Sequence, residues 1–288
     1  MANQKKLFNN TSYSKISVIM SIYNGERHLK EAVDSILNQT FKNFEFIIIN
    51  DGSTDRTGRI LKKYRKQDDR IKIINNKKNI GLTKSLNKGI RFSQGKYIAR
   101  MDADDISLPK RLEKQLNFME EHPKIGAVGC WYYLIDKNSK IFKKIQPPIN
   151  FFKIKKAFIN SSPIIHPGSM IKKIFLEKIN LYDEKFKYSQ DRDLWLRIMK
   201  YCQLAVIPEF LLKFRYSSES ISAKNEIEQK KCCLKAIRGA IKNKTYPKWY
   251  YVFTLRYLIS ICLPKPIWVL KNKILNFIGL RYDQKRIN

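Results

Sequence analysis

The sequence has few acidic residues and lacks several patterns that would point quickly to a function. Its 25 Asp and Glu residues stand against 57 Lys and Arg, which gives a formal net charge of +32 over 288 residues. The five cysteines include no C-x-x-C pair, so neither a zinc site nor a disulfide framework is indicated. The first fifteen residues contain no apolar run of signal-peptide length, and we therefore expect an intracellular, cytoplasmic protein.

The familiar phosphate-binding loops are also missing. No G-x-G-x-x-G follows the first apolar segment, which argues against a dinucleotide-binding oxidoreductase. The nearest approach to a P-loop runs from Gly89 to Tyr97. It has one residue too many between its glycines and ends in Tyr where a Mg-binding Ser or Thr is needed.

Short β-branched runs alternate with amphipathic stretches over the first hundred residues. The pattern predicts strands at 16–22, 44–50, 71–75 and 96–102, with helices at 26–38, 54–66 and 82–92 between them. Such alternation is typical of an α/β fold with a doubly wound, mostly parallel sheet, and the 43% apolar content is enough to fill its core. Ligands of this fold class bind beyond the carboxyl ends of the strands.

The periodicity is less regular after Pro109, and the elements expected there are shorter. We expect a helix near 108–121, an apolar strand over 125–135 and a hairpin returning through 140–145. They are followed by a helix near 150–159, a loop with a short strand over 161–171, a helix beginning near Gln190 and a strand at 204–208.

Acidic residues gather after the predicted strands. Asp102, Asp104 and Asp105 place three carboxylates in four positions at the end of a buried strand, which is costly unless a cation or strong donors are nearby. A divalent ion such as Mg²⁺ would neutralise them and bridge substrate phosphates. The alternative is a solvated turn in which Asp105 or Ser107 caps the following helix. The segment DGSTD at 51–55 is similarly open to a turn-and-cap or a ligand-binding interpretation.

Six segments together resemble the family 2 glycosyltransferases with the GT-A fold, and the resemblance runs from Lys15 to Ser222. The segments are SVIMSIYNGERHLKEAVDSILNQTF (17–41), FIIINDGSTD (46–55), NIGLTKSLNKGI (79–90), GKYIARMDADD (95–105), IIHPGSMI (164–171) and QDRDLWLRI (190–198). The resemblance implies an inverting glycosyltransferase of the hexosyltransferase class. It would transfer a sugar from a nucleotide-diphosphate donor, with UDP favoured by family tendency, to a hydroxyl group.

The resemblance also implies roles for residues on the donor side. Tyr23 and Asp51 would line the nucleobase and ribose, and Ser21 would form the floor of the site. Asp102 and Asp104 match the D-x-D pair, with Asp102 facing the ribose or sugar and Asp104 ligating Mn²⁺ or Mg²⁺ at the diphosphate.

On the acceptor side, Asp191 matches the catalytic base, with Gln190 where the family more often has Glu. An alternative from helix spacing alone is that Asp191 caps its helix, and we expect Asp193 to pair with Arg197 at i,i+4. His166, in the I-H-P-G segment, would bind donor by donating to a diphosphate oxygen, although a lone loop histidine is often structural.

Two features depart from or refine the family pattern. Leu86 stands where an Arg before Asn87 is frequent, so one common contact near the nucleotide is missing. The Q-x-x-R-W motif of processive polysaccharide synthases is not found, which favours a non-processive enzyme that adds a single sugar.

The expected organisation has three parts. Residues 1–14 form an N-terminal extension. Residues 15–225 form the GT-A catalytic domain, with a Rossmann-like nucleotide-sugar half at 15–107 and an acceptor half at 108–225. Residues 226–288 form a basic, amphipathic helical tail.

The tail carries 14 basic and 3 acidic side chains, a net charge of +11. Its longest apolar run, WYYVFTLRYLISICL over 249–263, is interrupted by Arg256 and is shorter than the roughly 20 residues of a spanning helix. We therefore expect a peripheral enzyme, bound through its tail to the anionic inner face of the cytoplasmic membrane and acting on a glycan or lipid-linked acceptor. The alternative is a helix that packs back onto the catalytic domain.

Two other function classes fit parts of the sequence. The charge of +32 and fifteen tyrosines suit a nucleic-acid-binding protein, but no recognised nucleic-acid module is present, so we expect no nucleic-acid partner. A nucleotidyltransferase that makes nucleotide sugars also uses an α/β fold and carboxylate-bound Mg²⁺. It would begin with a Gly-rich basic loop after the first strand, and SIYNGERHL is a poor match.

Overall fold

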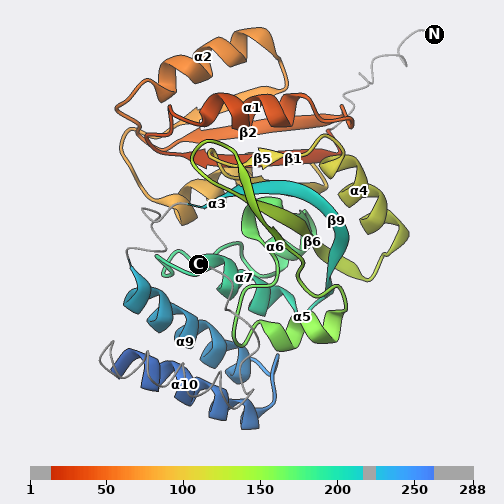
Figure 1. The fold of residues 1–288 in the computed structure, drawn as a ribbon, viewed down its shortest axis with the longest axis vertical. Helices are drawn as coiled ribbons and strands as arrows, with labels where there is room; N and C mark the ends of the chain where they lie inside the picture. The colour runs from red at the N-terminus through yellow and green to blue at the C-terminus, as the bar shows by residue number, and fades with distance from the viewer. Residues whose placement is uncertain (1–13, 217–224, 263–288) are drawn as a thin grey trace, which may run out of the picture.

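The computed structural model describes residues 14–216 and 225–262, and a single mixed sheet organises the first of these ranges (Figure 1). The strand order is β3-β2-β1-β4-β8-β6-β9-β5, and β7 pairs with β6 outside this path. Four parallel strands form one half: β1 (Ile16–Ile22), β2 (Phe44–Asn50), β3 (Ile71–Asn75) and β4 (Tyr97–Met101). Each of these predicted strands is confirmed to within one residue at either end.

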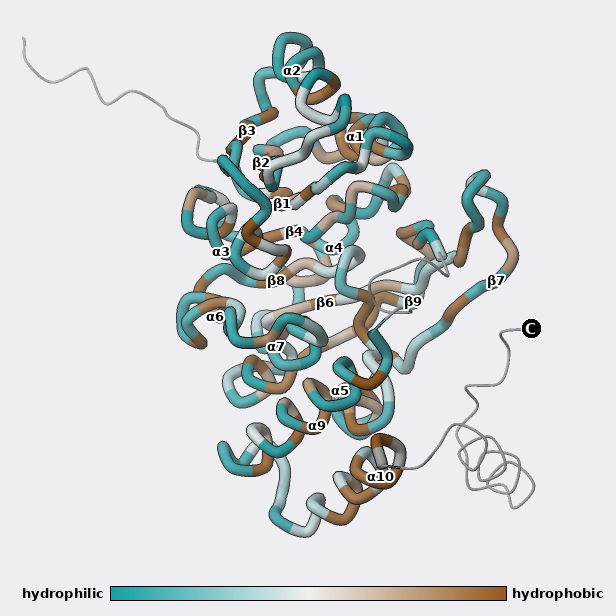
Figure 2. The backbone as a smooth tube through the Cα atoms, turned by 90° about the vertical axis from the view of Figure 1, so that its left-hand side faces the viewer, coloured by the Kyte–Doolittle hydropathy of each residue, from teal (hydrophilic) through white to brown (hydrophobic). Residues whose placement is uncertain are grey.

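Helices cover both faces of this parallel half, which confirms the doubly wound arrangement. The helices are α1 (Leu29–Leu37), α2 (Thr57–Gln67), α3 (Leu82–Phe92) and α4 (Arg111–Glu121). Alternate residues of β1 enter two hydrophobic clusters: Val18 and Met20 pack with α1, α2 and α4, whereas Ile19 packs with α3. Figure 2 shows α1 and α3 on opposite sides of the sheet.

The second half of the sheet is mixed. It contains β5 (Ile106–Ser107), β6 (Ile125–Ile135), β7 (Ile141–Ile145), β8 (Met170–Lys172) and β9 (Gln203–Arg215). Strand β8 runs antiparallel to both β4 and β6, and β6 runs parallel to β9. The carboxyl ends of β4, β6 and β9 therefore lie at the same edge of the sheet as those of β1 and β2.

Helices α1, α2 and α4 begin three residues later than predicted, and three further elements differ more from the prediction. Strand β9 continues to Arg215 instead of ending at Pro208, because register shifts around Trp131 leave Pro208 outside the ladder with β6. The two-residue strand β5 and the short helix α6 (Lys173–Lys178) were not expected. Both are too short to leave a periodic pattern in the sequence.

The other elements of the first range are α5 (Phe151–Ala157), the 3₁₀ turn η1 (His166–Gly168) and α7 (Gln190–Ile198). They are followed by α9 (Glu226–Lys242), the 3₁₀ turn η2 (Lys248–Tyr250) and α10 (Tyr251–Cys262). Ile237 and Ile241 of α9 are buried in the same hydrophobic cluster as Trp195 of α7. Helix α9 is thus part of the packed core, and α10 lies against α9 at the far end from α2 (Figure 1).

One side of η2 and α10 remains apolar and exposed. Trp249, Val252 and Leu255 are 62%, 61% and 54% exposed, and brown apolar segments run along α10 in Figure 2. Within residues 14–216 and 225–262, no helix has both the length and the apolar character needed to cross a bilayer. Most of the predicted extension at 1–14, and the tail beyond residue 262, lie outside the described residues.

Candidate active site

The acidic residues predicted as a metal site form one cluster at the carboxyl end of β4. Asp102, Asp104 and Asp105 each present a carboxylate oxygen, and these oxygens lie within 4.8 Å of one another. The cluster forms because a buried strand ends at Met101 and the chain turns at once into β5, so three carboxylates within four residues of the turn crowd together. Asp105 is buried, Asp102 is partly exposed and Asp104 lies at the rim.

The crowding leaves the negative charge of this cluster poorly compensated. Protein atoms around the Asp104 carboxyl group reduce its hydration, and together with the charge of Asp102 they raise its pKa to about 6. Full burial, with the charges of Asp104 and Asp102, raises the pKa of Asp105 well above its usual range. The Oδ2 atom of Asp105 is buried and has no hydrogen-bond partner. An additional cation at this point would favour the ionised carboxylates.

Buried arginines supply part of the compensation. The guanidinium of Arg100 in β4 forms an ion pair with Asp102. Arg215, at the end of β9, donates from its backbone N–H to Asp105 Oδ1 and from Nε to the carbonyl oxygen of Asp104, both at 2.8 Å. Arg111 donates to the carbonyl oxygens of Arg100 and Pro167, and burial lowers its pKa to about 10. Sequence patterns did not single out these arginines, because their partners lie far away along the chain.

The donor set suits a hard divalent cation. Carboxylate oxygens are the ligands that Mg²⁺ and Mn²⁺ prefer, and such ions keep several water or phosphate ligands in addition to one or two carboxylates. A cation here would pair with the unpartnered Oδ2 of Asp105 and would favour the ionised form of Asp104, whose pKa is raised. The residues present therefore fit the metal that the sequence implies.

The residues predicted to bind the nucleotide lie at the neighbouring strand ends. Ser21 is partly exposed near the end of β1, and Tyr23 follows that strand with 49% of its surface exposed. Asp51 follows β2 and is buried. Its carboxylate accepts hydrogen bonds from the backbone N–H groups of Ile80 and Gly81, both at 2.9 Å. Asp51 thus fixes the loop between β3 and α3 in addition to any contact it makes with a ligand.

The loops after β1 and β2 are tied to each other. Asn24 Oδ1 accepts from the backbone N–H of Thr54 at 2.9 Å, and Ser53 Oγ accepts from the backbone N–H of Asn24 at 3.1 Å. An added Cβ at Gly25 would lie 3.8 Å from Cβ of Ala103, which places the first loop beside the acidic turn. The predicted nucleotide-binding segments and the D-x-D turn therefore border one region of the sheet edge.

Asp191 lies in the first turn of α7 and is partly exposed. Ser162 Oγ donates to Asp191 Oδ2 at 3.4 Å. Burial is the main cause that raises the pKa of the Tyr182 phenol, and the charges of Asp191 and Asp102 both contribute. The charges of Asp191 and Asp102, which lie on different elements, therefore both act on this phenol. In contrast, Asp193 pairs with Arg197 at 2.8 Å, as the i,i+4 spacing predicts.

His166 is buried beneath the site. Its Nε2 lies 2.7 Å from the Tyr182 hydroxyl, and its ring packs edge-on against Trp195. Burial, with a contribution from the charge of Arg100, lowers the pKa of His166 well below its ordinary value, so the ring is neutral at pH 7. A contact between His166 and a donor diphosphate stays a prediction. The contacts described here give the ring a packing role between η1, Tyr182 and α7.

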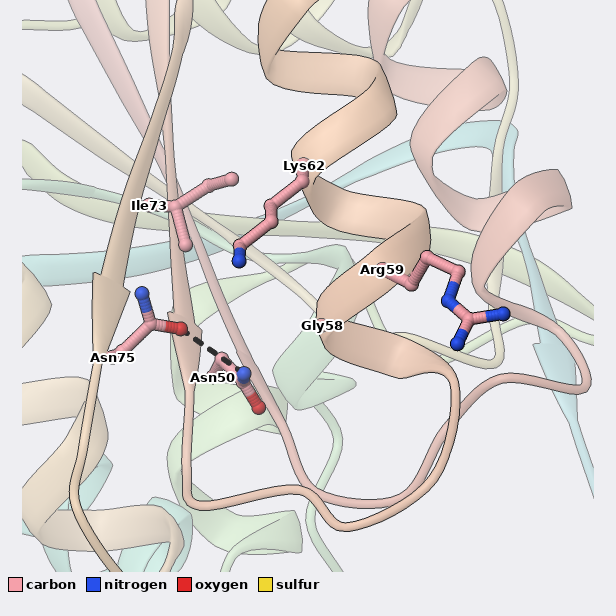
Figure 3. A pocket seen from close by; sticks show the side chains of 6 residues that line it. All are labelled: Asn50, Gly58, Arg59, Lys62, Ile73 and Asn75. Atoms are coloured by element: carbon pink, nitrogen blue, oxygen red, sulfur yellow. Dashed lines mark hydrogen bonds between the residues drawn. The ribbon is translucent and has the colours of Figure 1, made fainter.

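A pocket lies between α2 and the strands β2 and β3 (Figure 3). It is lined by Asn50, Gly58, Arg59, Lys62, Ile73 and Asn75. Lys62 extends from α2 toward the asparagines, whose amide groups are joined by a 3.0 Å hydrogen bond, whereas Arg59 points away from them. None of the predicted site residues lines this pocket, so it is separate from the acidic cluster.

The sequence matches the family model described as Glycosyl transferase family 2 over residues 17–179. Glycosyltransferase MJ1057 of Methanocaldococcus jannaschii is 41% identical over 235 residues, which cover 80% of this chain and 81% of that protein. The O-antigen biosynthesis glycosyltransferase WbnJ of Escherichia coli is 36% identical over 235 residues, which cover 80% of this chain and 90% of that protein.

Solved structures share the fold at low sequence identity. S. aureus TarS in complex with UDP-GlcNAc has a TM-score of 0.66 at 20% identity, over 86% of this chain and 71% of that chain. In the TarS complex with UDP, the match covers 77% of this chain and 65% of that chain, with a TM-score of 0.61 and 21% identity. The mannosyltransferase PcManGT of Pyrobaculum calidifontis, in complex with GDP-Man and Mn²⁺, has a TM-score of 0.65 at 17% identity. The match covers 93% of this chain and 81% of that chain. These likenesses confirm a fold of the GT-A type.

Proposed function

Because the chain belongs to glycosyl transferase family 2, we propose that it moves one sugar at a time from a nucleotide-diphosphate donor to a hydroxyl group of a glycan acceptor, with inversion at the anomeric carbon. UDP is the favoured nucleotide. The observation that carries this proposal is the cluster of three carboxylates at the end of β4, beside the loops that follow β1 and β2.

The proposal assigns the donor diphosphate to the acidic turn. Asp104, which lies at the rim, would hold Mn²⁺ or Mg²⁺, and Asp102 would face the ribose or the transferred sugar. When bound, the cation supplies Lewis-acid stabilisation of the departing diphosphate. PcManGT, a structural neighbour with 17% identity, was solved with GDP-Man and Mn²⁺, which supports the choice of metal.

The nucleoside would lie against Tyr23 and Asp51, with Ser21 beneath it. The exposed ring of Tyr23 offers a surface on which a nucleobase can stack. Asp51 Oδ1 and Oδ2 already accept hydrogen bonds from the 76–81 loop, so this carboxylate would hold that loop in place around the nucleoside. TarS was solved with UDP and UDP-GlcNAc, which supports a uridine donor.

Asp191 would act as the general base. It is partly exposed at the start of α7, and its charge acts on the same Tyr182 phenol as that of Asp102. A base in this position takes the proton from the acceptor hydroxyl as the new glycosidic bond forms. A single displacement then inverts the anomeric carbon without a covalent intermediate. General-base catalysis of this kind contributes about 10² to 10⁴-fold in rate.

The proposed acceptor is a lipid-linked glycan at the inner face of the cytoplasmic membrane. Trp249, Val252 and Leu255 expose an apolar surface on η2 and α10, in a segment of net positive charge. Aromatic and basic side chains together suit the headgroup region of an anionic membrane. WbnJ is named for O-antigen biosynthesis, and its 36% identity supports a role in the assembly of a surface glycan.

The proposed function is tested without knowledge of the acceptor. Purified protein is incubated with UDP-, GDP- and dTDP-sugars, with and without Mn²⁺, and slow hydrolysis of each donor is measured. The proposal predicts that UDP-sugars are hydrolysed faster than GDP- and dTDP-sugars, and only with the metal. Equal hydrolysis after removal of metal by EDTA would contradict the metal-dependent mechanism.

A further inference from the structure

Three aromatic side chains form a surface on β6 and β9 that the proposed catalytic residues do not account for. The ring of Tyr133 stacks on that of Phe210, with centroids 4.4 Å apart and planes 18° apart. The ring of Trp131 lies 5.5 Å from that of Phe210, at a tilt of 60°. All three are partly exposed. We call this group the aromatic platform.

The platform lies on the same face of the sheet as the predicted base. Trp131 packs against the hydrophobic cluster that contains Leu194 and Trp195 of α7, the helix that carries Asp191. Tyr133 follows Trp131 by two residues on the same strand, so its side chain points to the same face. The intervening Tyr132 packs against the other cluster, as strand alternation requires.

The platform also lies close to the acidic cluster along the strands. Tyr133 is two residues before Ile135, which pairs with Arg215, and two residues of a strand span about 7 Å. Arg215 in turn donates to the backbone carbonyl of Asp104 at 2.8 Å. An interruption of the β6–β9 ladder beside Trp131 bends β9 at this point, and such bulges commonly re-aim side chains next to active sites.

Two lysines flank the platform. Lys144 of β7 and Lys213 of β9 pair with Tyr133 from its two sides, so all three side chains share one face. The ammonium group of Lys144 lies 5.8 Å from the centre of the Phe210 ring. An aromatic surface between two cations suits a ligand that has an apolar face and a negative charge.

We propose that the aromatic platform, with Lys144 and Lys213, binds an acceptor saccharide that carries an anionic group. This inference rests on the proposed function and names the class of acceptor. One face of a pyranose ring is lined by C–H groups and packs on flat aromatic side chains, while its hydroxyl groups stay free for hydrogen bonds. The anionic group, a sugar carboxylate or a sugar-linked phosphate, lies near the lysines.

The experiment uses the full chain with saturating UDP and Mn²⁺, so that the donor site is filled. Binding of three probes is measured by saturation-transfer NMR titration: methyl β-glucopyranoside, methyl β-glucuronide and glucose 1-phosphate. The variants are Tyr133→Leu, Phe210→Leu and the double variant Lys144→Gln with Lys213→Gln. Phe92→Leu, which changes an exposed aromatic residue at the end of α3, is the matched control.

We expect at least one anionic probe to bind the wild type more tightly than the neutral glucoside. Each leucine variant should weaken binding of that probe by about fivefold, the scale of one lost aromatic contact. The lysine double variant should remove the preference for the anionic probe, and Phe92→Leu should change nothing. Stronger binding of the glucuronide identifies a carboxylate, and stronger binding of glucose 1-phosphate identifies a phosphate.

Three results would overturn the inference: no probe binds the wild type, the neutral glucoside binds as tightly as both anionic probes, or the leucine variants bind like the wild type. Thermal stabilisation of every variant by UDP with Mn²⁺ is measured alongside, as a check that the fold and the donor site are intact. If UDP with Mn²⁺ stabilises the wild type while no saccharide binds, this inference fails and the proposed function stands. If UDP with Mn²⁺ does not bind the wild type, the proposed function itself fails.

Discussion

The backbone N–H of Arg215 donates a 2.8 Å hydrogen bond to the carboxylate of Asp105, across 110 residues of sequence. The side chain of the same arginine binds the carbonyl oxygen of Asp104 through Nε and the carboxylate of Glu31 through Nη2, both at 2.8 Å. Arg215 is buried. One residue at the end of β9 therefore holds the acidic turn in place and joins it to α1.

The first prediction concerns this connection. Arg215→Lys keeps the charge but loses the planar fork that reaches several acceptors at once. We expect the free energy of unfolding to fall by about 1–3 kcal/mol, because buried acceptors lose their donors. We also expect UDP with Mn²⁺ to bind more weakly. Urea unfolding and calorimetric titration measure the two effects, with Arg65→Lys as the control on an exposed ion pair. If Arg215→Lys has the free energy of unfolding and the UDP affinity of the wild type, Arg215 does not hold the acidic turn in place.

The second prediction concerns Gly52, which follows Asp51. Its φ is +73°, and an added Cβ would lie 2.5 Å from the carbonyl carbon of Lys78. Gly52→Ala should therefore displace the 76–81 loop, lower the free energy of unfolding by about 1–3 kcal/mol and weaken nucleotide binding. Gly239→Ala is the matched control, because it lies in α9 with no atom within 4 Å of the added Cβ. That control should stabilise the protein by about 0.5–1 kcal/mol. If Gly52→Ala and Gly239→Ala change stability and nucleotide binding equally, Gly52 is not needed for the position of the 76–81 loop.

The third prediction separates chemistry from binding. Asp191→Asn should leave the affinity for UDP with Mn²⁺ nearly unchanged, while donor turnover in the presence of an acceptor falls by about 10²-fold or more. Asp193→Asn, two residues away, should instead lower the melting temperature, because it weakens the ion pair with Arg197. Kinetics and calorimetry on both variants test the difference. Parallel losses of donor binding and turnover in Asp191→Asn would make that residue a donor ligand or a helix cap.

The fourth prediction concerns the apolar surface of η2 and α10. Full-length protein should co-sediment with vesicles that contain phosphatidylglycerol, less so as salt rises, because part of the attraction is electrostatic. Trp249→Gln combined with Leu255→Gln should reduce binding at every salt concentration, since these side chains are exposed. Phe92→Gln is the control at a distant exposed site. Unchanged sedimentation of the double variant would exclude this surface as the membrane contact.

The parallel half of the fold could be predicted from sequence because its signals are local. Each of the first four strands is a short apolar run followed at once by polar residues, as in FEFIIIN before Asp51. The acidic turn could also be predicted, because its three aspartates follow directly after one of these strands. The full length of β9 could not be predicted, because Pro208 indicates a strand end. Only the interrupted pairing with β6 shows that the strand continues to Arg215.

The arginines around the acidic turn could not be predicted, since each acts across a long sequence separation. Arg111 reaches the carbonyl oxygen of Pro167, and Arg215 reaches Glu31. Long-range packing of the tail could not be predicted either. Its composition indicates a basic amphipathic segment, yet only the folded chain shows that Ile237 of α9 is buried beside α7. The boundaries predicted at 225 and 226 stay predictions.

The central claim is that the carboxylates at the end of β4 bind a nucleotide diphosphate through a divalent cation, with Asp104 as a ligand. Calorimetric titration of UDP into the protein tests it most directly, in the presence of Mn²⁺ and after EDTA, for the wild type, Asp104→Asn and the exposed control Asp69→Asn. We predict that UDP binds the wild type and Asp69→Asn only with Mn²⁺, and that Asp104→Asn loses the metal-dependent binding. Equal UDP affinity in Asp104→Asn and the wild type, with Mn²⁺ present, would contradict the claim.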